Sequence, residues 1–258
     1  MPSEPAARKT ALVTPKSQKP VNQEQLDFVI AADLRTLRTY FLNGEFRKAN
    51  NFLHEKVMKE GVSRDQRELC NVCLIYVFLK LKEYENAKTL ARELLEELER
   101  QDTLSLEARE KEFPVKFLLA ASLYELKQND SLQIFYQILA ELKTKMGEAK
   151  SRLAPVPQKK SEWTALDSLR VEVNELFGAF PRRDDYQAKY IMVAFEICRV
   201  HTRMQDYRNA YKIITSCAKM FPGNPYVLSK AGRLCLETGR KAEAKKFFDT
   251  MRSMIQDQ

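Results

Sequence analysis

Apolar residues recur every three or four positions along most of this 258-residue chain, and that spacing places them on one face of an α-helix. The pattern is clearest near the C-terminus, where two segments align over a spacing of 34 residues. Ala210 aligns with Ala244, and Ile214 aligns with Phe248. A period of this length is typical of helix–turn–helix units that bury their apolar faces only by stacking on their neighbours.

Small residues at fixed positions of the repeat support this interpretation, because two helices approach closely only where one side chain is small. Bulky residues stand beside them, and the segment Phe221-Pro222-Gly223-Asn224-Pro225 ends one helix and begins the next. The repeat signature consists of Ala49, Ala87, Ala210, Gly232, Ala244, Phe248, Tyr207 and Pro222. Together these residues predict a tetratricopeptide-repeat-like helical solenoid.

The turn and alanine around Ala210 recur at Ala49 and Ala87, whereas Leu132 replaces the alanine in a looser third copy. This predicts about five helix pairs, with an insert between the third and the fourth. We expect four segments: a disordered basic tail at 1–21, N-terminal helical repeats at 22–146, a linker and extra helix at 147–185, and a C-terminal repeat pair at 186–258.

The composition narrows the class of protein. Seven glycines and ten prolines are few for this length, and no alternating strand pattern is evident, so the fold is predicted to be all-α. Five cysteines, an odd number, and no apolar signal segment favour a reducing compartment. Because no apolar run approaches the roughly 20 residues of a membrane span, we expect membrane contact to be at most peripheral.

The net charge of +8 suggests nucleic acid as a partner until it is located along the chain. Residues 1–20 hold four basic residues and one acidic residue, and residues 143–160 hold six basic residues and one acidic residue. The net charges of these two segments, +3 and +5, add up to the net charge of the whole chain. We therefore expect a balanced helical body without a basic stripe, and no nucleic-acid partner.

Two pairs of residues resemble half-sites for zinc: Cys70-x-x-Cys73 and Cys198-x-x-His201. The alternative interpretation, which we favour, places them on core-facing positions of well-separated helices. The chain has two histidines, His54 and His201, on positions that look exposed or groove-lining, and it has no phosphate loop, dinucleotide fingerprint or nucleophile elbow. We therefore predict no catalytic residue, no metal site and no cofactor.

Helical-repeat grooves can also clamp the C-terminal carboxylate of a peptide. Lys116, Lys230 and Arg233 are candidates for such a clamp, but consecutive repeats lack asparagines at matching positions. The predicted groove is apolar and mixed in character, which favours contacts with other folded proteins.

The order of these features resembles one family, the C-terminal tetratricopeptide region of the twelfth subunit of the transport protein particle (TRAPP), a vesicle-tethering complex. The resemblance covers about residues 32–255. Its motifs, in chain order, are Gly44-Glu45-Phe46 with Ala49, Cys73-Leu74 with Lys80-Leu81 and Asn86-Ala87, Phe113-Pro114-Val115 with Leu118-Leu119, a charged insert, Met204-Gln205-Asp206-Tyr207, Phe221-Pro222, and Gly232-Arg233 leading to Ala244 and Phe247-Phe248.

The resemblance implies a non-enzymatic scaffold that holds other TRAPP subunits in endoplasmic-reticulum-to-Golgi transport and in autophagy. Such a protein would be cytoplasmic and peripheral to ER–Golgi membranes, and it would have no small-molecule substrate. Members of that family carry a long N-terminal extension and further repeats after the last one found here. A free-standing tetratricopeptide adaptor that binds short peptides of chaperone, motor or cargo partners is the alternative.

Overall fold

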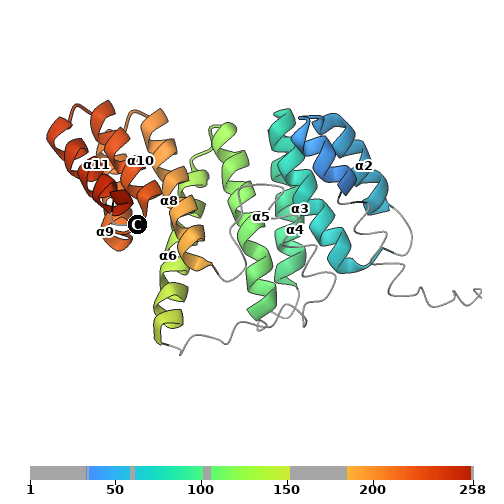
Figure 1. The fold of residues 1–258 in the computed structure, drawn as a ribbon. Helices are drawn as coiled ribbons and strands as arrows, with labels where there is room; N and C mark the ends of the chain where they lie inside the picture. Colours follow the sequence, from blue (N-terminus) through green and yellow to red (C-terminus); the bar gives the residue numbers. More distant parts are fainter. Residues whose placement is uncertain (1–32, 34, 59–61, 101–105, 152–184, 257–258) are drawn as a thin grey trace, which may run out of the picture.

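The structure, a computed structural model, describes residues 33, 35–58, 62–100, 106–151 and 185–256 (Figure 1). Residues 35–42 are helical. The helices that follow are α2 (Phe46–Met58), α3 (Arg64–Leu81), α4 (Tyr84–Glu99), α5 (Leu106–Glu125), α6 (Asp130–Ser151), α8 (Tyr186–Arg203), α9 (Tyr207–Met220), α10 (Pro225–Glu237) and α11 (Lys241–Gln256). No strand occurs in these ranges. The expected tail at 1–21 and the expected extra helix around Trp163 lie outside the described residues.

The helices form five successive pairs that stand side by side in one extended array (Figure 1). We call the first helix of each pair the A helix (residues 35–42, α3, α5, α8 and α10) and the second the B helix (α2, α4, α6, α9 and α11). Helices α4, α6, α9 and α11 each pack on the A helix of their own pair, and α2, α4, α6 and α9 each pack on the A helix of the next pair. The predicted all-α solenoid is therefore confirmed, and the array continues directly from the third pair to the fourth.

Every A helix ends in the same turn. The turns place one residue in the left-handed region: Gly44 (φ 69°), Lys82 (φ 63°), Lys127 (φ 58°), Gln205 (φ 60°) and Gly239 (φ 75°). The residue after it donates its backbone N–H to a carbonyl of the last helical turn, as Asp206 does to His201 at 2.8 Å and Arg240 does to Cys235 at 2.7 Å. This hydrogen bond satisfies a carbonyl that the helix end would otherwise leave without a partner, and it reverses the chain.

Four alanines of the repeat signature lie at the contact between A and B helices. Ala49, Ala87, Ala210 and Ala244 stand five residues after the left-handed residue, and none of them has exposed surface. Their methyl groups allow the B helix to approach its neighbours closely, because a larger side chain would have to displace a packed helix.

The third pair has a different register from the one predicted. Ser131 is 3% exposed and takes the small position, whereas Leu132 is only half-buried. The turn after Lys127 is one residue longer than the others, because α6 begins three residues after Lys127 whereas the other B helices begin two residues after their left-handed residue. The resulting row, Ser131, Phe135, Ile138 and Leu142, repeats the spacing of Ala87, Ala91, Leu94 and Leu98.

The remaining signature residues lie in the last two pairs. Gly232 is buried beneath the ring of Phe248, because a Cβ built at Gly232 would lie 2.7 Å from Phe248 Cζ. Tyr207 is the first residue of α9 and is 41% exposed, so its ring covers the helix contact only in part. Pro222 is exposed in the turn between α9 and α10. Helix α10 begins at Pro225, and the side chain of Asn224, the residue before it, accepts a hydrogen bond from the backbone N–H of Val227 at 3.1 Å.

The first residues of the segment expected to be a linker, from 147 to 151, are helical. Gly147 lies inside α6, which runs on to Ser151. A Cβ at Gly147 would meet nothing within 4 Å, so the glycine interrupts the sequence pattern without ending the helix. Residues 152–184 of the expected insert lie outside the described ranges.

We expect Gly232→Ala to lower the free energy of unfolding by about 1–2 kcal/mol. Overpacking against the Phe248 ring costs roughly 1–3 kcal/mol, and the higher helix propensity of alanine offsets up to about 1 kcal/mol of this cost. Gly147→Ala is the matched control, because it also replaces a helical glycine but meets nothing, and it should stabilise the protein by about 0.5–1 kcal/mol. Chemical denaturation of both variants measures the difference, and equal midpoints would contradict the packing described here.

Candidate functional site

The exposed side of the A helices carries basic and aromatic residues near the turns. Arg38, Lys80, Arg203 and Arg233 are exposed there. Lys80 lies over the ring of Tyr76, with its Nζ 5.0 Å from the ring centroid. Because successive A helices lie side by side in a solenoid, these side chains form an extended surface that is suited to contact with another protein.

A cluster on this surface joins the third pair to the fourth. Tyr124 on α5 receives two guanidinium groups from α8, with the Cζ of Arg199 5.4 Å and the Cζ of Arg203 5.8 Å from its ring centroid. Glu125 pairs with the same two arginines, at 4.0 Å from Arg199 and 3.5 Å from Arg203. The cluster holds both arginines in place, and it leaves the side chain of Arg203 54% exposed toward a partner.

The three residues considered for a carboxylate clamp do not come together. Lys116 on α5 pairs with Glu112 at 2.8 Å and with Glu141 at 3.5 Å, so two carboxylates already neutralise its charge. A small hollow beside it, of about 10 Å³, extends to Tyr186, and this is room for roughly one water. Lys230 and Arg233 are exposed on α10, beyond α8 and α9.

His201 lies in the core, which confirms the core-facing interpretation of the Cys198-x-x-His201 pair, and it does not line a groove. It is 6% exposed, and its Nε2 lies 2.9 Å from the hydroxyl of Tyr136 on α6. Its Nδ1 lies 3.0 Å from Asp206 Oδ2, an ion-pair distance without hydrogen-bond alignment. Hydrogen bonds from Asn209 hold the pKa of the Asp206 carboxyl below its ordinary value. The ionised carboxylate favours the proton on Nδ1, so Nε2 accepts a hydrogen bond from Tyr136.

The cysteine pairs that suggested zinc lie on α3 and α8. Burial raises the pKa of Cys70 to about 11 and that of Cys217, on α9, to about 12. It also raises the pKa values of Cys73 and Cys198. A thiol with a raised pKa is a poor nucleophile and a poor metal ligand, which favours a packing role. No cluster of three or more potential metal ligands occurs within the part of the chain that the structure describes.

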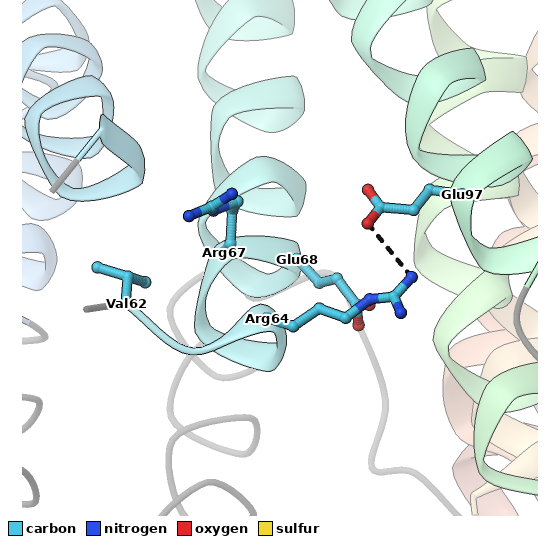
Figure 2. Close-up of a pocket in the computed structure, with 5 residues that line it drawn as sticks. All are labelled: Val62, Arg64, Arg67, Glu68 and Glu97. Carbon is cyan, nitrogen blue, oxygen red and sulfur yellow. Dashed lines mark hydrogen bonds and ion pairs between the residues drawn. The ribbon is translucent and has the colours of Figure 1, made fainter. Parts of the chain in front are cut away.

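The larger hollow lies between the start of α3 and the end of α4 (Figure 2). It has a volume of about 240 Å³ and is lined by Val62, Arg64, Arg67, Glu68 and Glu97. Arg64 lies between the two carboxylates, at 3.3 Å from each (Figure 2). Both carboxylates of the lining, Glu68 and Glu97, are paired with Arg64, so these side chains form a network of ion pairs.

Neither a protein-family model nor a curated protein matches the sequence. Among solved structures, the fold is similar to a Podosopora anserina protein described as having nearly identical kinesin light chain TPR-like repeats, with a TM-score of 0.50. The alignment covers 90% of this chain and 97% of that chain at 11% sequence identity, so the similarity concerns the fold. The chain therefore has a tetratricopeptide-like repeat fold.

None of the helices in the described ranges has both the length and the apolar character needed to cross a bilayer.

We expect Tyr136→Phe to lower the free energy of unfolding by about 1 kcal/mol, because it removes the donor to a buried histidine nitrogen. Tyr226→Phe is the matched control. Tyr226 is 80% exposed, so the loss of its hydroxyl should change stability by less than about 0.5 kcal/mol. Denaturant titrations of the two variants measure both effects. Equal stability of the two variants would contradict a structural role for the contact between Tyr136 and His201.

Proposed function

We propose that this chain is a non-enzymatic scaffold subunit of a TRAPP-type vesicle-tethering complex, acting in ER-to-Golgi transport and in autophagy. The observation that carries the proposal is the continuous five-pair solenoid, which offers long protein-binding surfaces. A cytoplasmic location, peripheral to ER–Golgi membranes, follows from this role.

The residues that carry the resemblance to the tether subunit occupy defined places in the fold. Gly44 and Ala87 stand at the turn and at the small contact position, and Gly232 lies under Phe248. These residues maintain the solenoid. The identity of the partners therefore depends on exposed residues, such as Arg203 and Arg233 on the A-helix side.

Purification of the tagged full chain from its own cells at mild salt tests the proposal. We expect other TRAPP subunits to co-purify in stoichiometric amounts. Arg38→Glu combined with Arg233→Glu should reduce that recovery while the thermal unfolding transition is retained, because both side chains are exposed and neither belongs to the Tyr124 cluster. Recovery of the intact protein without any tether subunit would overturn the proposal.

A free-standing peptide adaptor is the second candidate, and the cluster around Tyr124 favours it specifically. Two guanidinium groups stacked on one ring, beside Lys80 on Tyr76, offer cationic and aromatic contacts for an acidic peptide segment. A peptide array probed with the purified chain tests this role. We expect acidic peptides to bind at micromolar concentration or better, and Tyr124→Ala to weaken them. The absence of any such peptide would remove this candidate.

A further inference from the structure

Helix α11 is the last B helix of the array, and among the described residues no A helix follows it (Figure 1). In the inner pairs, one side of the B helix faces the next pair. Tyr211, the residue after Ala210 on α9, marks this side, because its hydroxyl donates a hydrogen bond to Glu243 of the fifth pair. Arg240, also of the fifth pair, stacks on the Tyr211 ring at 3.9 Å. The residue after the small contact residue therefore points toward the next pair.

A stripe of basic side chains occupies that side of α11. Lys245 follows Ala244 directly, at the place that Tyr211 has on α9. Lys241 and Arg252 lie within about 40° of Lys245 around the helix axis. All three basic residues are exposed, and none forms an ion pair with the residues that the structure describes. We expected no basic stripe on the helical body, and this stripe shows that expectation to be wrong.

The acidic residues of α11 leave the stripe with a net positive charge. Glu243 lies on the opposite side of the helix, toward α9, and is engaged by Tyr211. Asp249 is exposed and lies about 60° from the centre of the stripe around the helix axis. One carboxylate at the margin does not balance three cations.

The inner B helices have mostly apolar residues at the same places. Arg252 stands eight residues after the small contact residue, where the other pairs have an apolar residue that packs on the core: Val57, Leu95, Leu139 and Ala218. Lys245 stands one residue after it, where the other pairs have a half-buried residue: Asn50, Lys88, Leu132 and Tyr211. Since an apolar neighbour would bury the cations of α11 without a partner, this side does not suit an ordinary repeat.

Apolar surface accompanies the stripe. Phe248, four residues after the small contact residue, is half-buried, whereas the residues at the same place on the inner B helices are at most 2% exposed: Leu53, Ala91, Phe135 and Ile214. Leu236, near the end of α10, is 52% exposed. The matching residue of the first pair, Phe41, contacts Tyr76 of the next A helix, with 5.7 Å between the ring centroids. Both apolar side chains of the last pair are therefore open where an inner pair is covered.

The turn between α10 and α11 brings the two parts of this surface together. Leu236 and Lys241 correspond to Phe41 and Phe46 of the first pair, counted from the left-handed residue. The ring centroids of Phe41 and Phe46 are 5.8 Å apart, so the exposed leucine lies at the start of the basic stripe. We call the combined surface the end face; it consists of Leu236, Lys241, Lys245, Phe248 and Arg252.

The end face needs apolar and acidic groups from one partner. On this side each inner pair receives the A helix of the next pair, so its shape suits a helix. Such a helix needs an apolar row for Leu236 and Phe248. It also needs carboxylates on its flank, because the three cations repel one another and attract the opposite charge. A nucleic acid offers the negative charge without the apolar row.

A second copy of this chain does not meet these requirements at either end of its array. Its own end face has the same positive charges. Its first A helix, residues 35–42, contains Arg35 and Arg38 and no acidic residue. Like charges across a contact are unfavourable, so charge complementarity favours a different protein as the partner.

We propose that the end face binds an amphipathic helix of a partner protein, and that this helix has an acidic flank. Its apolar row packs on Leu236 and Phe248, and its carboxylates pair with Lys241, Lys245 and Arg252. It lies where each inner pair receives the next A helix. The inference is independent of the proposed tether function, because it concerns the end of the solenoid.

Fluorescence anisotropy tests the proposal with the purified full chain and a labelled helical peptide of about 18 residues, or five turns. The peptide has leucines along one face and glutamates on both flanks of that face. We expect micromolar binding that weakens as salt is raised. A peptide of the same composition with its leucines scattered around the helix should bind roughly tenfold more weakly. Equal binding of the two peptides would overturn the proposal, as would the absence of binding.

Substitutions in the end face test which residues hold the peptide. A variant with Lys241→Gln, Lys245→Gln and Arg252→Gln should bind it roughly tenfold more weakly, since an exposed ion pair contributes up to about fivefold. Leu236→Ser should also weaken binding, because it removes an apolar contact. The thermal unfolding transition should be retained in both variants, since all four side chains are exposed. Unchanged affinity in both would place the peptide elsewhere and overturn the proposal.

The matched control is a variant with Arg208→Gln, Lys212→Gln and Lys219→Gln. These residues are exposed on α9, on the side of the helix opposite Ala210, and their loss lowers the net charge by the same amount. Because exposed charges beyond the contact are largely screened, we expect the control to bind within about twofold of the unaltered chain. Equal weakening in the control and in the end-face variant would assign the attraction to net charge, against the proposal.

Sedimentation equilibrium of the chain alone supplies the last arm of the experiment. We expect a monomer at micromolar concentrations, because the end face repels its copy. A dimer that the combined substitution of Lys241, Lys245 and Arg252 disperses would assign the end face to a second copy of the chain and would overturn the proposed partner.

Discussion

Close approach of each B helix to its neighbours is the constraint on which this solenoid depends. The approach needs a side chain no larger than alanine or serine at one position of every B helix, and five buried residues supply it: Ala49, Ala87, Ser131, Ala210 and Ala244. It also needs a turn that reverses the chain within two or three residues. A left-handed residue in each turn meets that need. Three of these left-handed residues are not glycines, so their backbone conformation is strained. The packing of the helices on both sides of each turn offsets the cost of that strain.

The same constraint explains how far the sequence could predict the fold. The 34-residue spacing and the alanines depend on contacts within one repeat, so they are visible as local patterns. The register of the third pair is different, because Ser131 and Leu132 are adjacent and either one could occupy the small position in a pattern-based alignment. The turn after Lys127 is one residue longer than the other turns, and the length of a turn is not encoded in a single residue type.

Side-chain contacts between different repeats could not be predicted from these local sequence patterns. The core-facing position of His201 follows from its place in the repeat, but its contact with Tyr136, which lies 65 residues earlier in the chain, does not. The cluster of Tyr124 with Arg199 and Arg203 likewise joins α5 to α8 across the insert. The order of repeats could be predicted from the sequence, but the side chains that meet across the junction between pairs could not.

The charge of the B helices shows which part of the surface is free of folding constraints. Helices α4 and α9 have the same place in their pairs, contact their A helices through the same kind of small residue, and yet carry opposite net charges. Since the fold accepts either sign at these exposed positions, packing does not require the positive charge of α9 and α11.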